Sequence, residues 1–100
     1  MIQKYDKKIG KYVYHTDDFI DCKLKVKRVL TYLFYLNDVD EGGETEFPKL
    51  NIKVPPKKGR MVYFENYKEG KINYDSTHRS IPVKTGEKWA FNLWYHDKVL

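Results

Sequence analysis

The sequence predicts an all-β domain built as a sandwich or a barrel. Apolar residues recur with a period of two along most of the chain, and no segment longer than about ten residues carries a helical apolar stripe. Clusters of glycine and proline separate the short apolar runs. With 41% hydrophobic and 16% aromatic residues, the 100 residues have the size and composition of one folded domain spanning 1–100.

The clearest expected strand covers residues 28–37, where RVLTYLFYLN is rich in β-branched and aromatic side chains. It is apolar on both faces, which is typical of a central strand that is covered on both sides. Residues 38–44 (DVDEGGE) form the next turn, with Gly42 and Gly43 at its tightest point. Further strands are expected at 11–16, 51–54, 60–65, 76–80 and 88–96, with Pro48, Pro55, Pro56 and Pro82 between them. Residues 17–27 fit either a loop or one irregular helical turn.

The charge pattern disfavours several classes of function. The net charge of +5 comes from sixteen lysines and three arginines, and the lysines are scattered, unlike the clustered bases of a nucleic-acid surface. A solvated basic surface explains them, although attraction to an acidic substrate stays open. No apolar run approaches the roughly 18 residues of a membrane span. Cys22 is the single cysteine, so an intramolecular disulfide is excluded and a reducing, cytoplasmic location is expected.

Three residues are candidate metal ligands: His15, Asp17 and His78. Two histidines and one carboxylate are the ligand set that holds non-haem Fe(II) with coordination positions left open. If the strand at 11–16 reaches Asp17, alternation points His15 and Asp17 to one face. Each signal alone is weak, because a His-x-Asp pair arises often by chance and a single histidine is more often a core or surface residue.

Lys88 opens the apolar run KWAFNLWYH and shares a strand face with Ala90, Asn92 and Trp94. A lysine on an inward face is costly unless a counter-charge meets it. An anionic co-substrate bound at the metal would supply that charge. The alternative is that Lys88 flanks the strand end in solvent and that Trp94 is ordinary packing.

Four segments carry a resemblance to a known family: KYDKKIGKYVYHTD, RVLTYLFYLNDVDEGGETEFP, PKKGRMVYFEN and THRSIPVKTGEKWAFNLWYH. They resemble the Fe(II)- and 2-oxoglutarate-dependent dioxygenases of the prolyl 4-hydroxylase type. The motifs R-x-x-T, Y-L-N, G-G-E-T-x-F-P and H-x9-K-W stand in family order, and the four segments cover about two-thirds of the residues. The resemblance implies a double-stranded β-helix, or jelly-roll, with a cupin-like core, truncated at its N-terminus relative to the family.

The resemblance also assigns roles to residues. His15, Asp17 and His78 would bind the iron, and Lys88 would pair with the distal carboxylate of 2-oxoglutarate. Thr31, inside R-x-x-T, matches a position that hydrogen-bonds the same carboxylate.

Tyr5 matches a tyrosine with a similar role in the family. The stretch from Gly10 to His15 is one residue shorter than the usual pattern, which makes Tyr12 the rival of Tyr5.

The function that the resemblance implies is hydroxylation of an unactivated C–H bond, with release of succinate and CO2. A prolyl or other peptidyl side chain is the leading substrate and a small metabolite the alternative, and L-ascorbate would re-reduce iron oxidised in unproductive turnovers. Oxygenases that repair nucleic acid bind 2-oxoglutarate with an R-x5-R pattern near the second histidine. Here Arg79 is followed six residues later by Thr85, which disfavours that branch.

Two other functions compete with this one: a non-catalytic or decayed β-sandwich binding module, and an iron or zinc jelly-roll enzyme that does not use 2-oxoglutarate. Family members have N-terminal elements that cover one face of the larger sheet, and the chain begins almost at the first motif. An uncovered apolar sheet face favours association, so a dimer or a partner protein is expected to cover it.

Overall fold

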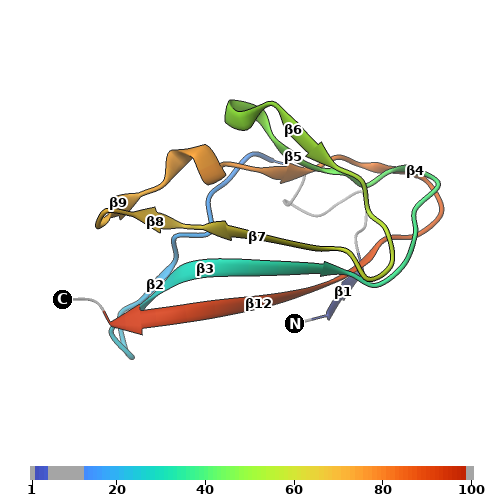
Figure 1. The fold of residues 1–100 in the computed structure, drawn as a ribbon. Helices are drawn as coiled ribbons and strands as arrows, with labels where there is room; N and C mark the ends of the chain where they lie inside the picture. The colour runs from blue at the N-terminus through green and yellow to red at the C-terminus, as the bar shows by residue number, and fades with distance from the viewer. Residues whose placement is uncertain (1, 5–12, 99–100) are drawn as a thin grey trace.

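The computed structural model describes residues 2–4 and 13–98, which fold into two layers of β-strands (Figure 1). The larger layer is a five-stranded antiparallel sheet in which β3 pairs with both β12 and β7. Its strands are β1 (Ile2–Lys4), β12 (Trp89–Lys98), β3 (Val26–Tyr35), β2 (Ile20–Asp21) and β7 (Met61–Glu65).

The smaller layer is a three-stranded sheet in the order β10-β5-β6, accompanied by two short pairs: β11-β4, which joins distant segments, and the hairpin β8-β9. Its strands are β10 (Arg79–Ser80), β5 (Thr45–Phe47), β6 (Ile52–Val54), β11 (Val83–Thr85), β4 (Glu41–Gly42), β8 (Tyr67–Lys68) and β9 (Lys71–Ile72). The 3-10 helices η2 (Pro48–Leu50) and η3 (Tyr74–Ser76) complete it. The described residues are mainly strand, as the all-β jelly-roll prediction requires.

The core lies between the two layers. Leu33 and Tyr35 of β3 and Ala90 of β12 are buried there, and Val54 and Val62 pack against them from β6 and β7. Successive β3 side chains alternate, so Thr31, Leu33 and Tyr35 face the smaller layer. This face of β3 positions the cavity described below.

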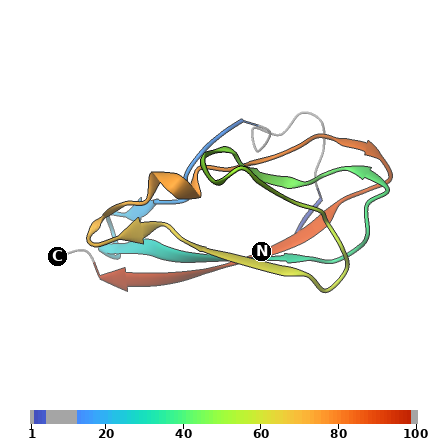
Figure 2. The same ribbon diagram turned by 45° about the horizontal axis from the view of Figure 1, so that its top comes forward.

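The opposite face of the larger sheet is apolar and exposed. In Figures 1 and 2 the smaller layer lies on one side of this sheet, and the described residues place no strand or helix on the other side. Tyr63 and Tyr95 are 62% and 60% exposed there, and Tyr63 stacks on Tyr32 at 5.9 Å between ring centroids. The prediction that strand 28–37 is covered on both sides is therefore not met within these residues.

Most expected strands are present with shifted ends. Ranges 28–37, 51–54, 60–65 and 88–96 correspond to β3, β6, β7 and β12. The strand at 76–80 is wrong in its first part, because Ser76 ends η3, whose turn is closed by the bond from the Ser76 N–H to the Asn73 carbonyl. Of 11–16, residues 11 and 12 lie outside the described part, and the remainder forms one bridge at His15 in place of a strand.

Residues 17–27 are mainly loop, as the first of the two alternatives expects: 17–19 have no regular structure, and 22–25 form a turn between β2 and the start of β3. The turn at 38–44 contains the short strand β4. Gly42 is required there, because its φ is +80° and a Cβ would lie 2.2 Å from the Pro82 carbonyl oxygen. No helix in the described ranges is long and apolar enough to cross a membrane.

Candidate metal centre

The three candidate ligands converge at one end of the space between the layers. One donor atom from each of His15, Asp17 and His78 lies within 4.8 Å of the others. Oδ1 of Asp17 is 3.5 Å from Nε2 of His15 and 3.6 Å from Nε2 of His78. Two imidazole nitrogens and one carboxylate oxygen facing a common point suit a divalent transition metal.

An isolated antiparallel bridge brings the two histidines together. The N–H of His15 donates to the carbonyl of His78 and the N–H of His78 donates back, each at 2.9 Å. Directly opposed residues project their side chains to the same face, so the two rings lie 4.4 Å apart between centroids. Asp17 reaches the same point from an extended segment, without the strand that the sequence predicts.

Main-chain carbonyls fix the tautomer of both rings. Nδ1 of His15 lies 2.8 Å from the Val13 carbonyl, and Nδ1 of His78 lies 2.7 Å from the Ser76 carbonyl. Because a carbonyl only accepts, each Nδ1 carries the proton and donates. Each Nε2 is left with a free lone pair directed at the Asp17 side, which is the arrangement of metal-binding histidines.

His78 is the more enclosed of the two ligands, at 8% exposure. Burial lowers its pKa, and the Asp17 carboxylate opposes that shift. A lowered pKa keeps the imidazole neutral to lower pH, and the neutral form is the one that binds metal. The rings of Phe64 and Phe47 pack against it at 4.7 and 5.5 Å between centroids.

Thr31 orients Asp17. The Thr31 hydroxyl donates to Oδ2 of Asp17 at 3.0 Å, which leaves Oδ1 for the histidine side, and Nδ2 of Asn66 donates to the same hydroxyl at 2.9 Å. Thr31 and Asn66 are both buried. In this structure the single Thr31 proton is donated to Asp17, and the expected contact of Thr31 with a co-substrate carboxylate stays a prediction.

Replacing Thr31 by valine is expected to weaken divalent metal binding. The change removes the donor to Asp17 and leaves a buried Asn66 N–H unpaired, at a cost of about 1–3 kcal/mol in stability. We expect the dissociation constant for Fe(II) to rise roughly 10- to 100-fold, as it does when a hydrogen-bond partner of a ligand is lost. Anaerobic titration measures it, and Thr31→Ser is the matched control, since it keeps the hydroxyl. Equal affinity of the valine and serine variants would contradict this role.

Lys88 is fully buried just before β12 begins. Its Nζ donates to Oγ of Ser80 at 2.9 Å and lies 5.5 Å from the centroid of the Tyr35 ring. The alternative in which Lys88 flanks the strand end in solvent is therefore wrong. An ammonium group held at this depth favours an anion beside it.

Three hydroxyl groups gather near Lys88, and none of them stands out in the sequence. Ser80 of β10 is the cross-strand partner of Thr45 in β5, and the hydroxyl of Thr45 lies 2.5 Å from that of Tyr35. Burial raises the pKa of Tyr35 to about 12, so the phenol stays neutral. Thr45 belongs to the G-G-E-T motif, and Ser80 lies two residues after His78. Only the pairing of β5 with β10 shows that Thr45 and Ser80 are neighbours.

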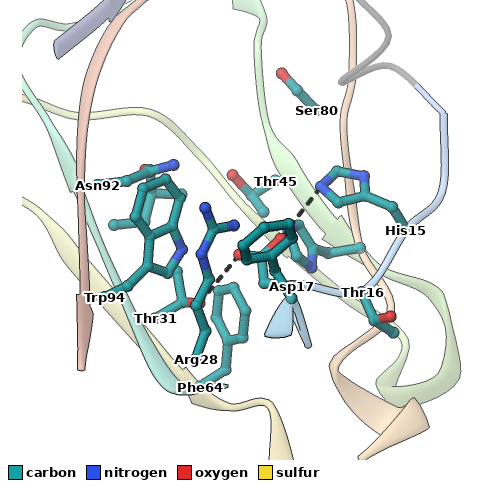
Figure 3. A pocket seen from close by; sticks show the side chains of 13 residues that line it. His15, Thr16, Asp17, Arg28, Thr31, Thr45, Phe64, Ser80, Asn92 and Trp94 are labelled. Carbon is teal, nitrogen blue, oxygen red and sulfur yellow. Dashed lines mark hydrogen bonds and ion pairs between the residues drawn. The ribbon is translucent and has the colours of Figure 1, made fainter. Parts of the chain in front are cut away.

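A cavity of about 440 Å³ lies beside the candidate ligands (Figure 3). Its lining includes the three candidate ligands with Thr45 and Ser80, and also Phe19, Arg28, Asn92 and Trp94. The guanidinium of Arg28 stacks on the indole of Trp94 at 3.8 Å from its centroid. Nε of Arg28 and Nε1 of Trp94 are buried donors without a hydrogen-bond partner among the described residues, so this wall can donate to a bound molecule.

Tyr5 and its rival Tyr12 lie outside the described residues. The predicted contact of either tyrosine with a co-substrate therefore stays a prediction.

Comparison with known proteins gives consistent results. A family model described as the 2OG-Fe(II) oxygenase superfamily matches residues 1–96. The chain is 42% identical over 72 residues to prolyl 4-hydroxylase subunit alpha-1 of Homo sapiens, covering 71% of this chain and 14% of that protein. It is 36% identical to prolyl 4-hydroxylase 13 of Arabidopsis thaliana, covering 96% of this chain and 39% of that protein.

Among solved structures, the viral collagen prolyl hydroxylase of Paramecium Bursaria Chlorella virus-1, in its complex with 2OG, superposes with a TM-score of 0.80 at 34% identity. The match covers 99% of this chain and 57% of the viral one. The chain thus spans between about one-seventh and three-fifths of the length of these relatives.

Proposed function

Because the chain belongs to the 2OG-Fe(II) oxygenase superfamily, we propose that it is the catalytic core of a dioxygenase that hydroxylates an unactivated C–H bond. The family uses Fe(II) and 2-oxoglutarate, and ascorbate is typical of it. The observation that carries the proposal is the convergence of His15, Asp17 and His78 on one wall of a cavity that also reaches the Lys88–Ser80 pair.

The residues present fit an iron ion. Both histidines hold their Nδ1 protons on main-chain carbonyls and direct bare Nε2 atoms at Asp17. In this proposal His15, Asp17 and His78 are the protein ligands, and the adjacent cavity leaves room for further ligands on the open side. When bound, iron and 2-oxoglutarate supply the oxidation, in which one oxygen atom of O2 enters succinate and the other enters the substrate C–H bond.

Lys88 is the proposed partner of the distal 2-oxoglutarate carboxylate. Its Nζ donates to Oγ of Ser80, which lines the cavity. The Ser80 hydroxyl donates to the Ile81 carbonyl only at 3.5 Å, the long limit of a hydrogen bond, so it can turn its proton to a bound anion. Thr45 lies beside Ser80 on the same wall. We propose that Thr45 and Ser80 share the carboxylate-binding role that the resemblance implies for Thr31.

Peptidyl proline is the proposed substrate. Relatives with this activity in their names include the animal and plant prolyl 4-hydroxylases and the viral collagen prolyl hydroxylase. The Arg28–Trp94 wall supports a peptide: proline-rich chains bind on aromatic surfaces, and the N–H groups of Arg28 and Trp94 can donate to main-chain carbonyl oxygens. Another peptide side chain or a small metabolite would be the alternative substrate class.

The proposal is tested with the purified domain under anaerobic conditions. Fe(II) together with 2-oxoglutarate should give a weak visible charge-transfer band, and Fe(II) alone should not. After oxygen is admitted, proline-rich peptides should raise succinate release and gain one oxygen atom by mass spectrometry. A domain that binds neither iron nor 2-oxoglutarate would instead be the non-catalytic module. A metal site with no band on adding 2-oxoglutarate would favour the enzyme class that lacks this co-substrate.

A further inference from the structure

Behind the candidate ligands, on the face turned away from the cavity, three side chains form a second cluster: Tyr14, Glu46 and Arg79. Since His15 opposes His78 in the antiparallel bridge, Tyr14 stands opposite Arg79, and Arg79 is the cross-strand partner of Glu46 in β5. Alternation places all three on the outer side, and none of them lines the cavity. Tyr14 and Arg79 of the cluster therefore belong to the same two segments as His15 and His78, but their side chains lie on the face away from the cavity.

The three side chains contact one another directly. The Tyr14 hydroxyl donates to Oε1 of Glu46 at 2.7 Å, and Nε of Arg79 donates to the same oxygen at 2.9 Å. The Arg79 guanidinium also lies 4.8 Å from the centroid of the Tyr14 ring. The hydrogen bonds from Tyr14 and Arg79 lower the pKa of Glu46, which keeps it a charged acceptor. Each member thus holds the other two.

The segment that carries His15 and Asp17 needs such a cluster. In the described residues its strand pairing consists of one bridge with two main-chain hydrogen bonds, whereas β3 and β12 pair along nearly their whole lengths. A slip of one residue would turn His15 to the outer face, and a slip of two would move it out of line with His78. Two bonds at a single bridge specify that register weakly, and the other bonds from distant residues outside the cluster to this segment, at Asp17, Asp18 and Phe19, all lie after His15 in the chain.

We propose that Tyr14, Glu46 and Arg79 form a register lock, which holds His15 opposite His78 and so preorganises the metal centre. The inference rests on the proposed function, because a fixed position of His15 matters only if His15 binds the metal. The three are positioning residues: they touch neither the metal ligand atoms nor the cavity. Tyr14 is the member through which the lock acts on the His15 segment.

The test compares variants of this domain: Tyr14→Ala, Tyr14→Phe, Glu46→Val and Glu46→Gln. Lys53→Gln is the matched control, because Lys53 is the other cross-strand neighbour of Glu46 and lies on the third strand of the same sheet. Two quantities are measured: hydrogen exchange of the His15 amide in the metal-free protein, and the dissociation constant of Fe(II) from anaerobic titration in the presence of 2-oxoglutarate.

Tyr14→Ala and Glu46→Val should speed exchange of the His15 amide and raise the Fe(II) dissociation constant by about 3- to 10-fold, the equivalent of one net hydrogen bond. Tyr14→Phe keeps the ring under the guanidinium and loses only the hydroxyl bond, so its effect should be smaller. Glu46→Gln can still accept both bonds and should restore most of the affinity lost in Glu46→Val. Lys53→Gln should match the unaltered protein.

The Leu33 amide in the buried strand β3 is the internal reference for global stability. If the His15 and Leu33 amides lose protection by the same factor, the cluster acts on overall stability and the lock is refuted. Unchanged His15 exchange in Tyr14→Ala and Glu46→Val refutes it as well. If the unaltered protein binds no Fe(II), the proposed function fails, while the metal-free exchange measurement still decides whether the lock exists.

Discussion

Replacing His78 by alanine is expected to abolish Fe(II) binding and substrate-dependent succinate release. The change removes one of three protein ligands. Loss of a mere hydrogen-bond partner of a ligand already costs 10–100-fold in metal affinity or activity, so we expect a loss of more than about 100-fold. Isothermal titration under anaerobic conditions measures the first quantity, and a coupled succinate assay measures the second.

The chain offers a matched control for this variant. His96 is the one remaining histidine, lies exposed on β12, and belongs to neither the cavity nor the metal cluster, so His96→Ala should leave both quantities unchanged. His78 packs against Phe47 and Phe64, and its removal also opens a hole. His15→Ala therefore serves as a second ligand variant, since His15 is more exposed and packs less tightly. Iron-dependent turnover that survives in both ligand variants would overturn the assignment.

Replacing Lys88 by methionine is expected to weaken 2-oxoglutarate binding far more than it changes iron binding. Loss of one partner of a buried charge pair costs roughly 2–5 kcal/mol, which corresponds to about 30- to 5,000-fold in affinity. Methionine has nearly the same length and no charge. Because replacing a buried charge by an apolar group of similar volume is often neutral or stabilising, the metal-free protein should keep its melting temperature or gain a little.

A fall in 2-oxoglutarate affinity without a fall in melting temperature separates an effect on binding from an effect on folding. An apparent 2-oxoglutarate affinity that is unchanged in Lys88→Met would remove Lys88 from the site. A variant that melts much earlier would show that the ammonium group has a structural role through Ser80. Lys84→Met is the control, because Lys84 is an exposed lysine on β11 and should tolerate the change without effect on either measurement.

The sequence predicts local features of this fold well and cross-strand features poorly. Strand β3 follows from its own composition, since its β-branched and aromatic residues favour an extended chain. The strand expected at 76–80 begins only at Arg79, because the hydrogen bonds to Asn73 and Tyr74 make a tight turn before His78, and no period-two pattern records such bonds. The local pattern therefore predicts the type of element, and the turn decides where it begins.

The candidate site divides in the same way. His15 and Asp17 could be paired from their spacing, but their meeting with His78 depends on a bridge between distant segments. The hydrogen bond from Thr31 to Asp17 could not be predicted, because a motif records residue types and not which acceptor a hydroxyl meets. Thr45 and Ser80 were missed because neither is unusual alone, and only their cross-strand pairing beside Lys88 marks them.

Strand β12 contributes to two separate surfaces through its alternate residues. Its even-numbered residues Asn92 and Trp94 line the cavity, while its odd-numbered residues Leu93 and Tyr95 are exposed on the outer face of the sheet. Because a strand assigns alternate residues to opposite sides, substitutions at one set leave the other set's surroundings almost untouched. The residues that line the cavity and the residues that set the tendency of the outer face to associate can therefore evolve separately within the same ten residues. An insertion of one residue would exchange the two roles at every position beyond it.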